Sequence, residues 1–167
     1  MSGARLETGD GRPEQRGVVS ISSGALAAIR AHLIHAYPNE GCGVLIGSTA
    51  DDRIEISRAA GARNAEMKRG ADRFEIEPRD LMAIERELDA RRDGSQVVGF
   101  FHSHPDAPAR PSVTDLEMAR GLFDVTRAFY VYAIARVSAG GFEEISYWRL
   151  AEELGGFVEL NAAASAG

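Results

Sequence analysis

The sequence is short of cysteine, of positive charge and of long apolar runs, and each shortage argues against a class of protein. The single cysteine, Cys42, leaves no partner for an intramolecular disulfide, which fits a reducing compartment. The formal net charge of -6 argues against nucleic-acid binding, because that function needs a basic surface. No apolar run approaches the roughly 18 residues of a membrane span, and the N-terminus has no apolar signal-peptide segment. We therefore expect a cytoplasmic protein without nucleic-acid or membrane partners.

The length of 167 residues suits a single domain with a core of its own. Residues 1–16 are polar and rich in glycine and charge, so we expect a disordered leader there. We expect the folded domain to span residues 17–160 and the C-terminus to be frayed over residues 161–167. Between the ends there is no internal repeat, no low-complexity tract and no linker.

Alternating and apolar runs predict strands, and apolar residues at helical spacing predict helices. The predicted strands are residues 18–22, 41–49, 52–59, 73–78, 96–104, 128–138 and 141–151. The predicted helices are residues 24–37, 78–92 and 112–123. We expect 41–49 to pair with 52–59 across a turn, and the apolar run 96–104 to be central. This order predicts an α+β (mixed α/β) fold, with a mixed, largely antiparallel sheet flanked by about three helices.

The stretch "GFFHSHPDAPARPSVTDLEMA", residues 99–119, holds the most chemistry in the sequence. On a strand, residues i and i+2 point to the same face, so His102 and His104 would present two imidazoles side by side. That spacing suits one metal ion, and it also suits two structural histidines near a loop. Ser112 and Asp115 have the spacing of a helix capping box, which would explain both without any ligand. Capping would nevertheless fix Asp115 on the first turn, and a proline-rich loop could aim that turn back at the histidines.

The segment "HSHPDAPARPSVTD" matches H-x-H-x(7)-S-x(2)-D and resembles the signature of the JAMM (MPN-plus) zinc metalloproteases. The upstream segment "PNEGCGVLIG" supplies Glu40 in a setting similar to compact prokaryotic members. Asn64 and "FEIEPRDL" extend the likeness, which covers roughly residues 18–150. The resemblance implies an MPN/JAMM-like fold.

The resemblance also implies an active site. His102, His104 and Asp115 would bind one Zn²⁺ per chain, which would activate a water molecule. Glu40 would be the general acid/base, and Ser112 would donate a hydrogen bond to the developing oxyanion. The implied reaction is hydrolysis of a peptide or isopeptide bond after the C-terminal Gly-Gly of a ubiquitin-like or sulfur-carrier protein of the β-grasp type.

Several alternatives stay open. A non-catalytic MPN scaffold or binding module would have the same fold, although such proteins lose the polar positions that this sequence retains. A RadC-like JAMM domain would share the metal motif, but it usually carries an added helical N-terminal region. We expect Cys42 to be an inert buried thiol, because it lies in an apolar strand. For His32 and His35 we expect surface or core-edge positions.

The predicted substrate contacts lie in the irregular segment 61–74, "GARNAEMKRGADRF". Arg63, Lys68 and Arg69 could line a groove and meet an acidic carrier protein, and a solvated loop would explain these residues equally well. The short connection between His104 and Asp115 favours a small carrier over polyubiquitin. The sequence leaves open the carrier, the adduct, the native metal, an activating partner and the oligomeric state, a homodimer included.

Overall fold

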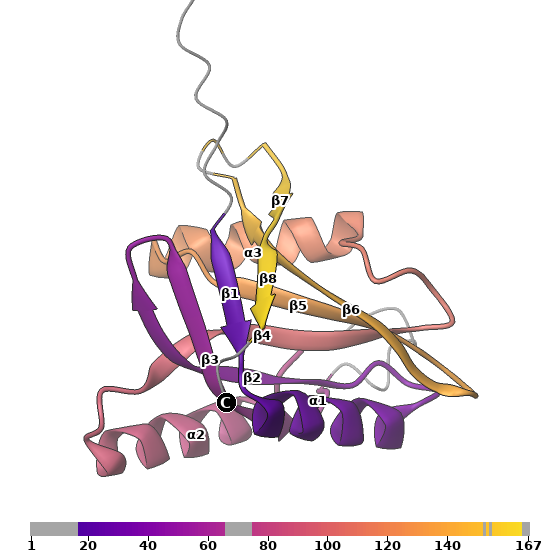
Figure 1. The fold of residues 1–167 in the computed structure, drawn as a ribbon, viewed down its shortest axis with the longest axis horizontal. Helices are drawn as coiled ribbons and strands as arrows, with labels where there is room; N and C mark the ends of the chain where they lie inside the picture. Colours follow the sequence, from indigo (N-terminus) through magenta and orange to yellow (C-terminus); the bar gives the residue numbers. More distant parts are fainter. Residues whose placement is uncertain (1–16, 66–74, 152, 154, 165–167) are drawn as a thin grey trace, which may run out of the picture.

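A computed structural model describes residues 17–65, 75–151, 153 and 155–164. Within these residues the helices are α1 (Ser23–Ala36), α2 (Pro78–Arg91) and α3 (Val113–Thr126). The strands are β1 (Val18–Ile21), β2 (Cys42–Ala50), β3 (Arg53–Ala62), β4 (Gln96–Pro105), β5 (Val131–Ser138), β6 (Gly141–Leu150), β7 (Phe157–Glu159) and β8 (Asn161–Ala164). The strands form one mixed sheet in the order β7-β6-β5-β4-β2-β3-β1-β8 (Figure 1).

The sheet is covered by helices on both faces, as the side chains of β2 demonstrate. Leu45 belongs to the core cluster that contains Ile29 and Leu33 of α1. Its neighbours Val44 and Ile46 point the other way and pack with Ile84 of α2. The cluster under α3 shares Phe100 with the cluster under α2, so α2 and α3 lie on the same face. A strand buried on both faces needs a continuous apolar sequence, which explains the composition of β2.

The strand β4 lies in the middle of this sheet. It pairs antiparallel with β2 and parallel with β5. At Gly99 the backbones of β4 and β5 approach so closely that a Cβ atom would lie 2.0 Å from the carbonyl oxygen of Val131. Only glycine therefore fits where the motif-bearing strand joins its parallel neighbour.

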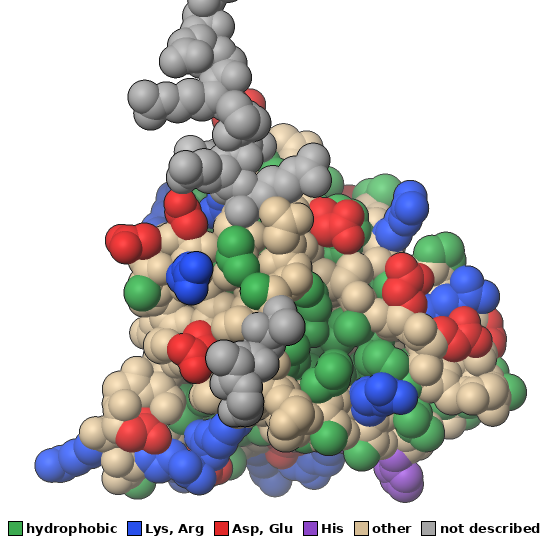
Figure 2. Space-filling view, viewed as in Figure 1, with side chains coloured by type: hydrophobic (Ala, Val, Ile, Leu, Met, Phe, Trp, Pro, Cys, Tyr) green, Lys and Arg blue, Asp and Glu red, His purple; other side chains and the backbone are tan. Residues whose placement is uncertain are grey.

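The molecular surface on the side of α1, β1 and β8 carries both charged and hydrophobic side chains. Figure 2 shows acidic and basic side chains interspersed on this face, with hydrophobic side chains gathered above α1. Partly buried hydrophobic residues that pack onto the α1 cluster include Ile21, Phe142 and Ile145. None of the helices in the described ranges is long and apolar enough to cross a membrane.

The predicted fold class is confirmed, including the pairing of β2 with β3 and the central place of β4. Two expectations differ from the structure. The strand predicted at 73–78 is reduced, within the described residues, to an isolated bridge between Asn64 and Ile76. The frayed C-terminus expected over 161–167 is wrong for Asn161–Ala164, because these residues form β8. The backbone of β8 pairs in parallel with β1, and this pairing needs no apolar side chains. The expected leader, residues 1–16, lies outside the described residues.

Candidate metal and active site

The two histidines of the motif lie next to each other on β4. The alternation of the strand puts both side chains on the face covered by α2 and α3, and their Nε2 atoms lie 3.2 Å apart. Both residues are buried, with 1% of His102 and 9% of His104 exposed. Two ring nitrogens are thus held together where little water can reach them.

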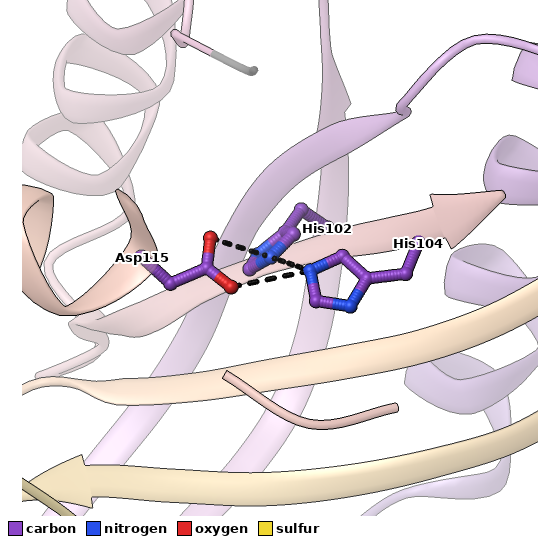
Figure 3. A group of neighbouring side chains, drawn as sticks. All are labelled: His102, His104 and Asp115. Carbon is purple, nitrogen blue, oxygen red and sulfur yellow. Dashed lines mark hydrogen bonds and ion pairs between the residues drawn. The ribbon is translucent and has the colours of Figure 1, made fainter. Parts of the chain in front are cut away.

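Asp115 comes to the histidines from the first turn of α3. Ser112 is the N-cap of this helix, and its Oγ accepts a hydrogen bond from the backbone N–H of Asp115. The Asp115 carboxylate in turn accepts the Ser112 N–H at 2.8 Å, which completes a capping box. Its Oδ1 lies 3.2 Å from His102 Nε2, and its Oδ2 lies 3.1 Å from His104 Nε2. Figure 3 shows the three side chains pointing toward one another from β4 and α3.

The orientation of the His104 ring is fixed by the motif loop. Its Nδ1 lies 2.9 Å from the carbonyl oxygen of Pro108, which can only accept a hydrogen bond. The Nδ1 atom must therefore carry the proton. In the neutral imidazole, Nε2 then has the lone pair that a cation needs, and the contact of Nε2 with Asp115 is a hydrogen bond only when the ring is protonated. The proline-rich loop thus sets the tautomer of His104 as well as the path of the chain.

The surroundings of the cluster determine which of its three side chains are charged. Burial acts to raise the pKa of Asp115, but hydrogen bonds from His102 and His104 hold the pKa well below its usual range. Burial lowers the pKa of His102. Burial also acts to lower the pKa of His104, but its bonds to Asp115 and to the Pro108 carbonyl raise the pKa overall. Asp115 is therefore ionised at neutral pH, whereas His102 is neutral.

This donor set fits a zinc ion. One ligand atom from each of His102, His104 and Asp115 can be chosen so that all three lie within 4.8 Å of one another. Two imidazole nitrogens with one carboxylate suit zinc better than magnesium or calcium, which prefer oxygen ligands. Three protein ligands would leave a fourth tetrahedral position for water or substrate.

Glu40 is separated from the first residue of β2 only by Gly41, and the sheet fixes its place relative to the motif. The Cα atoms of Cys42 and His102 are paired in the antiparallel register. Ser103 Oγ accepts the Gly41 N–H at 2.9 Å, and the Ser103 N–H donates to the Gly41 carbonyl at 3.0 Å. Glu40 is only 6% exposed, and its negative charge is among the causes that raise the pKa of His104. The glutamate therefore lies at the His104 end of the cluster.

The remaining predicted site residues have mixed positions. Ser112 is exposed at the start of α3. Arg63 forms an ion pair with Asp80, with 3.0 Å between Arg63 Nη2 and Asp80 Oδ1, so an intramolecular partner already accounts for its charge. Lys68 and Arg69 lie outside the described residues. His32 packs edge-on against the ring of Phe101, with 6.0 Å between the ring centroids.

Two features of this region were missed by sequence reasoning. One is the pair of hydrogen bonds that join Ser103 to Gly41. The other is an apolar pocket beside His102, whose floor includes Phe100 and Tyr132. The alternation of Phe100 with His102 was a usable signal for the pocket, since both must point to the same face.

The family described as "Prokaryotic homologs of the JAB domain" matches residues 22–151. The chain belongs to this prokaryotic JAB family. The match covers β2, β4, the motif loop and α3, and it confirms the resemblance to the JAMM (MPN-plus) proteins.

Three curated relatives of this JAB domain have names that state an activity. The "Probable TtuB-protein conjugate cleaving protease" of Thermus thermophilus is 31% identical over 103 residues, which is 62% of this chain and 64% of that protein. The "Desampylase" of Haloferax volcanii is 32% identical over 82 residues, which is 49% of this chain and 55% of that protein. The "CysO-cysteine peptidase" of Mycobacterium tuberculosis is 33% identical over 103 residues, which is 61% of this chain and 66% of that protein. The chain thus spans less than two thirds of the length of these relatives.

Two solution structures resemble the JAB domain over most of its length. A protein of Desulfitobacterium hafniense matches with a TM-score of 0.70 and 23% identity, covering 89% of this chain and 94% of that one. A protein of Salinibacter ruber matches with a TM-score of 0.63 and 34% identity, covering 87% of this chain and 91% of that one. The first likeness is one of fold alone.

The cysteine of this JAB domain should not react in the folded protein. Cys42 is fully buried, and burial, with smaller contributions from Glu40 and Asp80, raises the pKa of its thiol to about 12. Iodoacetamide at pH 8 should therefore leave the native protein unlabelled and modify the protein in denaturant, as measured by intact mass. Rapid labelling of the native protein would contradict this assignment and reopen a role for the thiol.

Proposed function

We propose that this protein is a zinc-dependent peptidase that hydrolyses the peptide or isopeptide bond after the C-terminal Gly-Gly of a ubiquitin-like or sulfur-carrier protein. The proposal rests on one observation above all. The buried cluster of two imidazoles and one carboxylate lies near a buried glutamate, Glu40, from the residues that lead into β2. The names of two relatives support the substrate class, because one is a probable protease of TtuB-protein conjugates and the other a CysO-cysteine peptidase.

In this proposal His102, His104 and Asp115 hold one zinc ion per chain. When bound, zinc supplies Lewis acidity that makes a water molecule nucleophilic near neutral pH. The capping box and the Pro108 carbonyl hold two of the donor residues in place. The three donor residues are buried, so an ion held by them would be shielded from bulk water on the protein side.

Two further side chains have proposed roles. The Glu40 carboxylate accepts the proton of the attacking water and then gives it to the leaving nitrogen. Because water itself is the nucleophile, no covalent acyl-enzyme forms. Ser112 Oγ accepts the N–H of Asp115, and its own proton remains available for the oxygen of the scissile carbonyl. The predicted contacts of Lys68 and Arg69 with an acidic carrier stay a prediction.

The proposed function is tested directly with purified substrates. The zinc-loaded protein is incubated with carrier proteins whose Gly-Gly tail bears an amide-linked adduct, and the products are read by intact mass. Release of the adduct, with the mass of one water added across the bond, is the expected result. Binding of the carrier without any cleavage would instead favour the non-catalytic MPN module.

Ser103 should position Glu40. Replacing Ser103 by alanine removes the acceptor of the Gly41 N–H, so the residue after Glu40 loses one of its two bonds to β4. We expect kcat to fall roughly tenfold or more, since small displacements of catalytic groups are costly. Zinc content and KM should change little. Steady-state kinetics and metal analysis measure these quantities.

A control and a double variant separate positioning from general destabilisation. Ser57→Ala removes a hydroxyl that donates to the Ile46 carbonyl, away from Glu40, and should keep kcat. In a Glu40→Gln background, Ser103→Ala should cause little further loss, because the group that it positions is already disabled. An equal loss in both backgrounds would disprove the positioning role.

A further inference from the structure

An apolar pocket of about 300 Å³ opens directly beside the cluster of His102 and Asp115. Its floor comes from β4 and β5, where Phe100 and Tyr132 are paired in the parallel register. Side chains at the start of α2 and on α3 form the walls. The apolar lining residues are Ile76, Leu81, Phe100, Met118, Leu122 and Tyr132. A concave apolar surface with polar reacting groups at one end is typical of a ligand subsite.

The pocket and Glu40 lie on opposite sides of the cluster along β4. Phe100 precedes His102 on the strand, so the pocket extends from the Phe100 end. Glu40 precedes Gly41, which is bonded to Ser103, and therefore lies toward the other end, at His104. Consider a substrate peptide that lies along β4 with its scissile bond at the cluster. The half on one side of that bond lies over the pocket, and the half on the other side lies near Glu40.

The two halves can be assigned, and this step rests on the proposed function. Glu40 gives a proton to the leaving nitrogen, so the leaving residue lies at the Glu40 end. The acyl half, which is the tail of the carrier, then lies over the pocket. Two glycines have no side chains to place in a pocket, and they extend the chain by only about 7 Å. The residues that precede them are thus the first whose side chains can enter.

We propose that this pocket binds an aliphatic side chain of the carrier tail, at one of the two positions that precede the Gly-Gly pair. The lining offers apolar contact to such a side chain, whereas an aspartate there would lose its hydration. Burial of one leucine side chain predicts a preference of roughly tenfold to a hundredfold over aspartate.

The test uses one carrier protein with leucine or aspartate at each of the two positions in turn, and always the same adduct. Two quantities are measured, kcat/KM for adduct release and the affinity of the zinc-loaded protein for the free carrier. We expect the leucine form to be favoured roughly tenfold or more in both, at one of the positions. Met118→Glu, which puts a carboxylate on the pocket wall, should abolish this preference.

The matched control is Met82→Glu. Met82 is 50% exposed on α2 and does not line the pocket, whereas Met118 is 38% exposed on α3 and does. Met82→Glu should keep the leucine preference, and both variants should match the wild type in thermal midpoint and zinc content. Equal values for the leucine and aspartate forms at both positions, or a leucine preference that survives Met118→Glu, would overturn the assignment of the pocket. A leucine preference in affinity without any adduct release would overturn the proposed hydrolysis and leave the pocket assignment standing. If there were neither a leucine preference nor adduct release, the pocket assignment and the proposed hydrolysis would both be wrong.

Discussion

Glu40→Gln should bind zinc like the wild-type protein and release the adduct about 10²–10⁴-fold more slowly. Glutamine has the size of glutamate and can form similar hydrogen bonds, so a residue that is only 6% exposed is replaced without a cavity. The amide cannot accept the proton of the attacking water, which is the role proposed for the carboxylate. The measurements are kcat on a carrier adduct, followed by intact mass, and zinc content by metal analysis.

The matched control for this variant is Glu85→Gln, an exposed glutamate on α2 that should leave both quantities unchanged. Two outcomes would count against the proposed role. Turnover within a few-fold of the wild type would show that another group accepts the proton. Loss of zinc would show that Glu40 is a metal ligand, which would leave the general base unassigned.

His104→Ala should lose both zinc and turnover. One of the three donors disappears, and the remaining imidazole and carboxylate cannot complete a site with three protein ligands. Zinc content after desalting should fall from about one per chain to nearly none. Added zinc should raise the thermal midpoint of the wild type, because a ligand at 100 times its Kd stabilises the native state by about 2.7 kcal/mol. The midpoint of the variant should not respond.

His35→Ala is the control for His104→Ala. His35 is an exposed histidine of α1, so its removal tests whether surface imidazoles contribute to the measured zinc. Zinc content and turnover should stay at wild-type values in this variant. If His104→Ala kept its full zinc content, the assignment of the three ligands would be wrong.

The sequence predicted those parts of the fold that local pattern determines. The apolar runs of β2 and β4 identified the centre of the sheet, because strands covered on both faces need continuous apolar residues. The strand β8 escaped prediction because "NAAA" has no alternation and few strand-forming side chains, and its partner β1 is distant in sequence. The alternation around Ile76 predicted a strand, but the described part of that segment forms one bridge only, to Asn64.

The candidate site also has parts that local sequence patterns predict and parts that they do not. The geometry of His102, His104 and Asp115 follows from two local rules, the alternation of a strand and the capping of a helix. Glu40 entered through family resemblance, because the register between β2 and β4 joins residues that are far apart in the chain. The alternation of Phe100 with His102 signals one part of the pocket floor, but the partner Tyr132 depends on a parallel register that no local signal encodes.

The hydrogen bonds that hold two of the proposed zinc donors have a consequence for the order of assembly. Asp115 is held by the backbone of Ser112 and His104 by the carbonyl of Pro108, and neither bond involves a cation. The chain should therefore fold first and load its metal afterwards, unlike zinc fingers, which are unfolded without metal. If the proposed peptidase activity holds, a chelator should give a folded but inactive protein, and added zinc should restore activity without a refolding step.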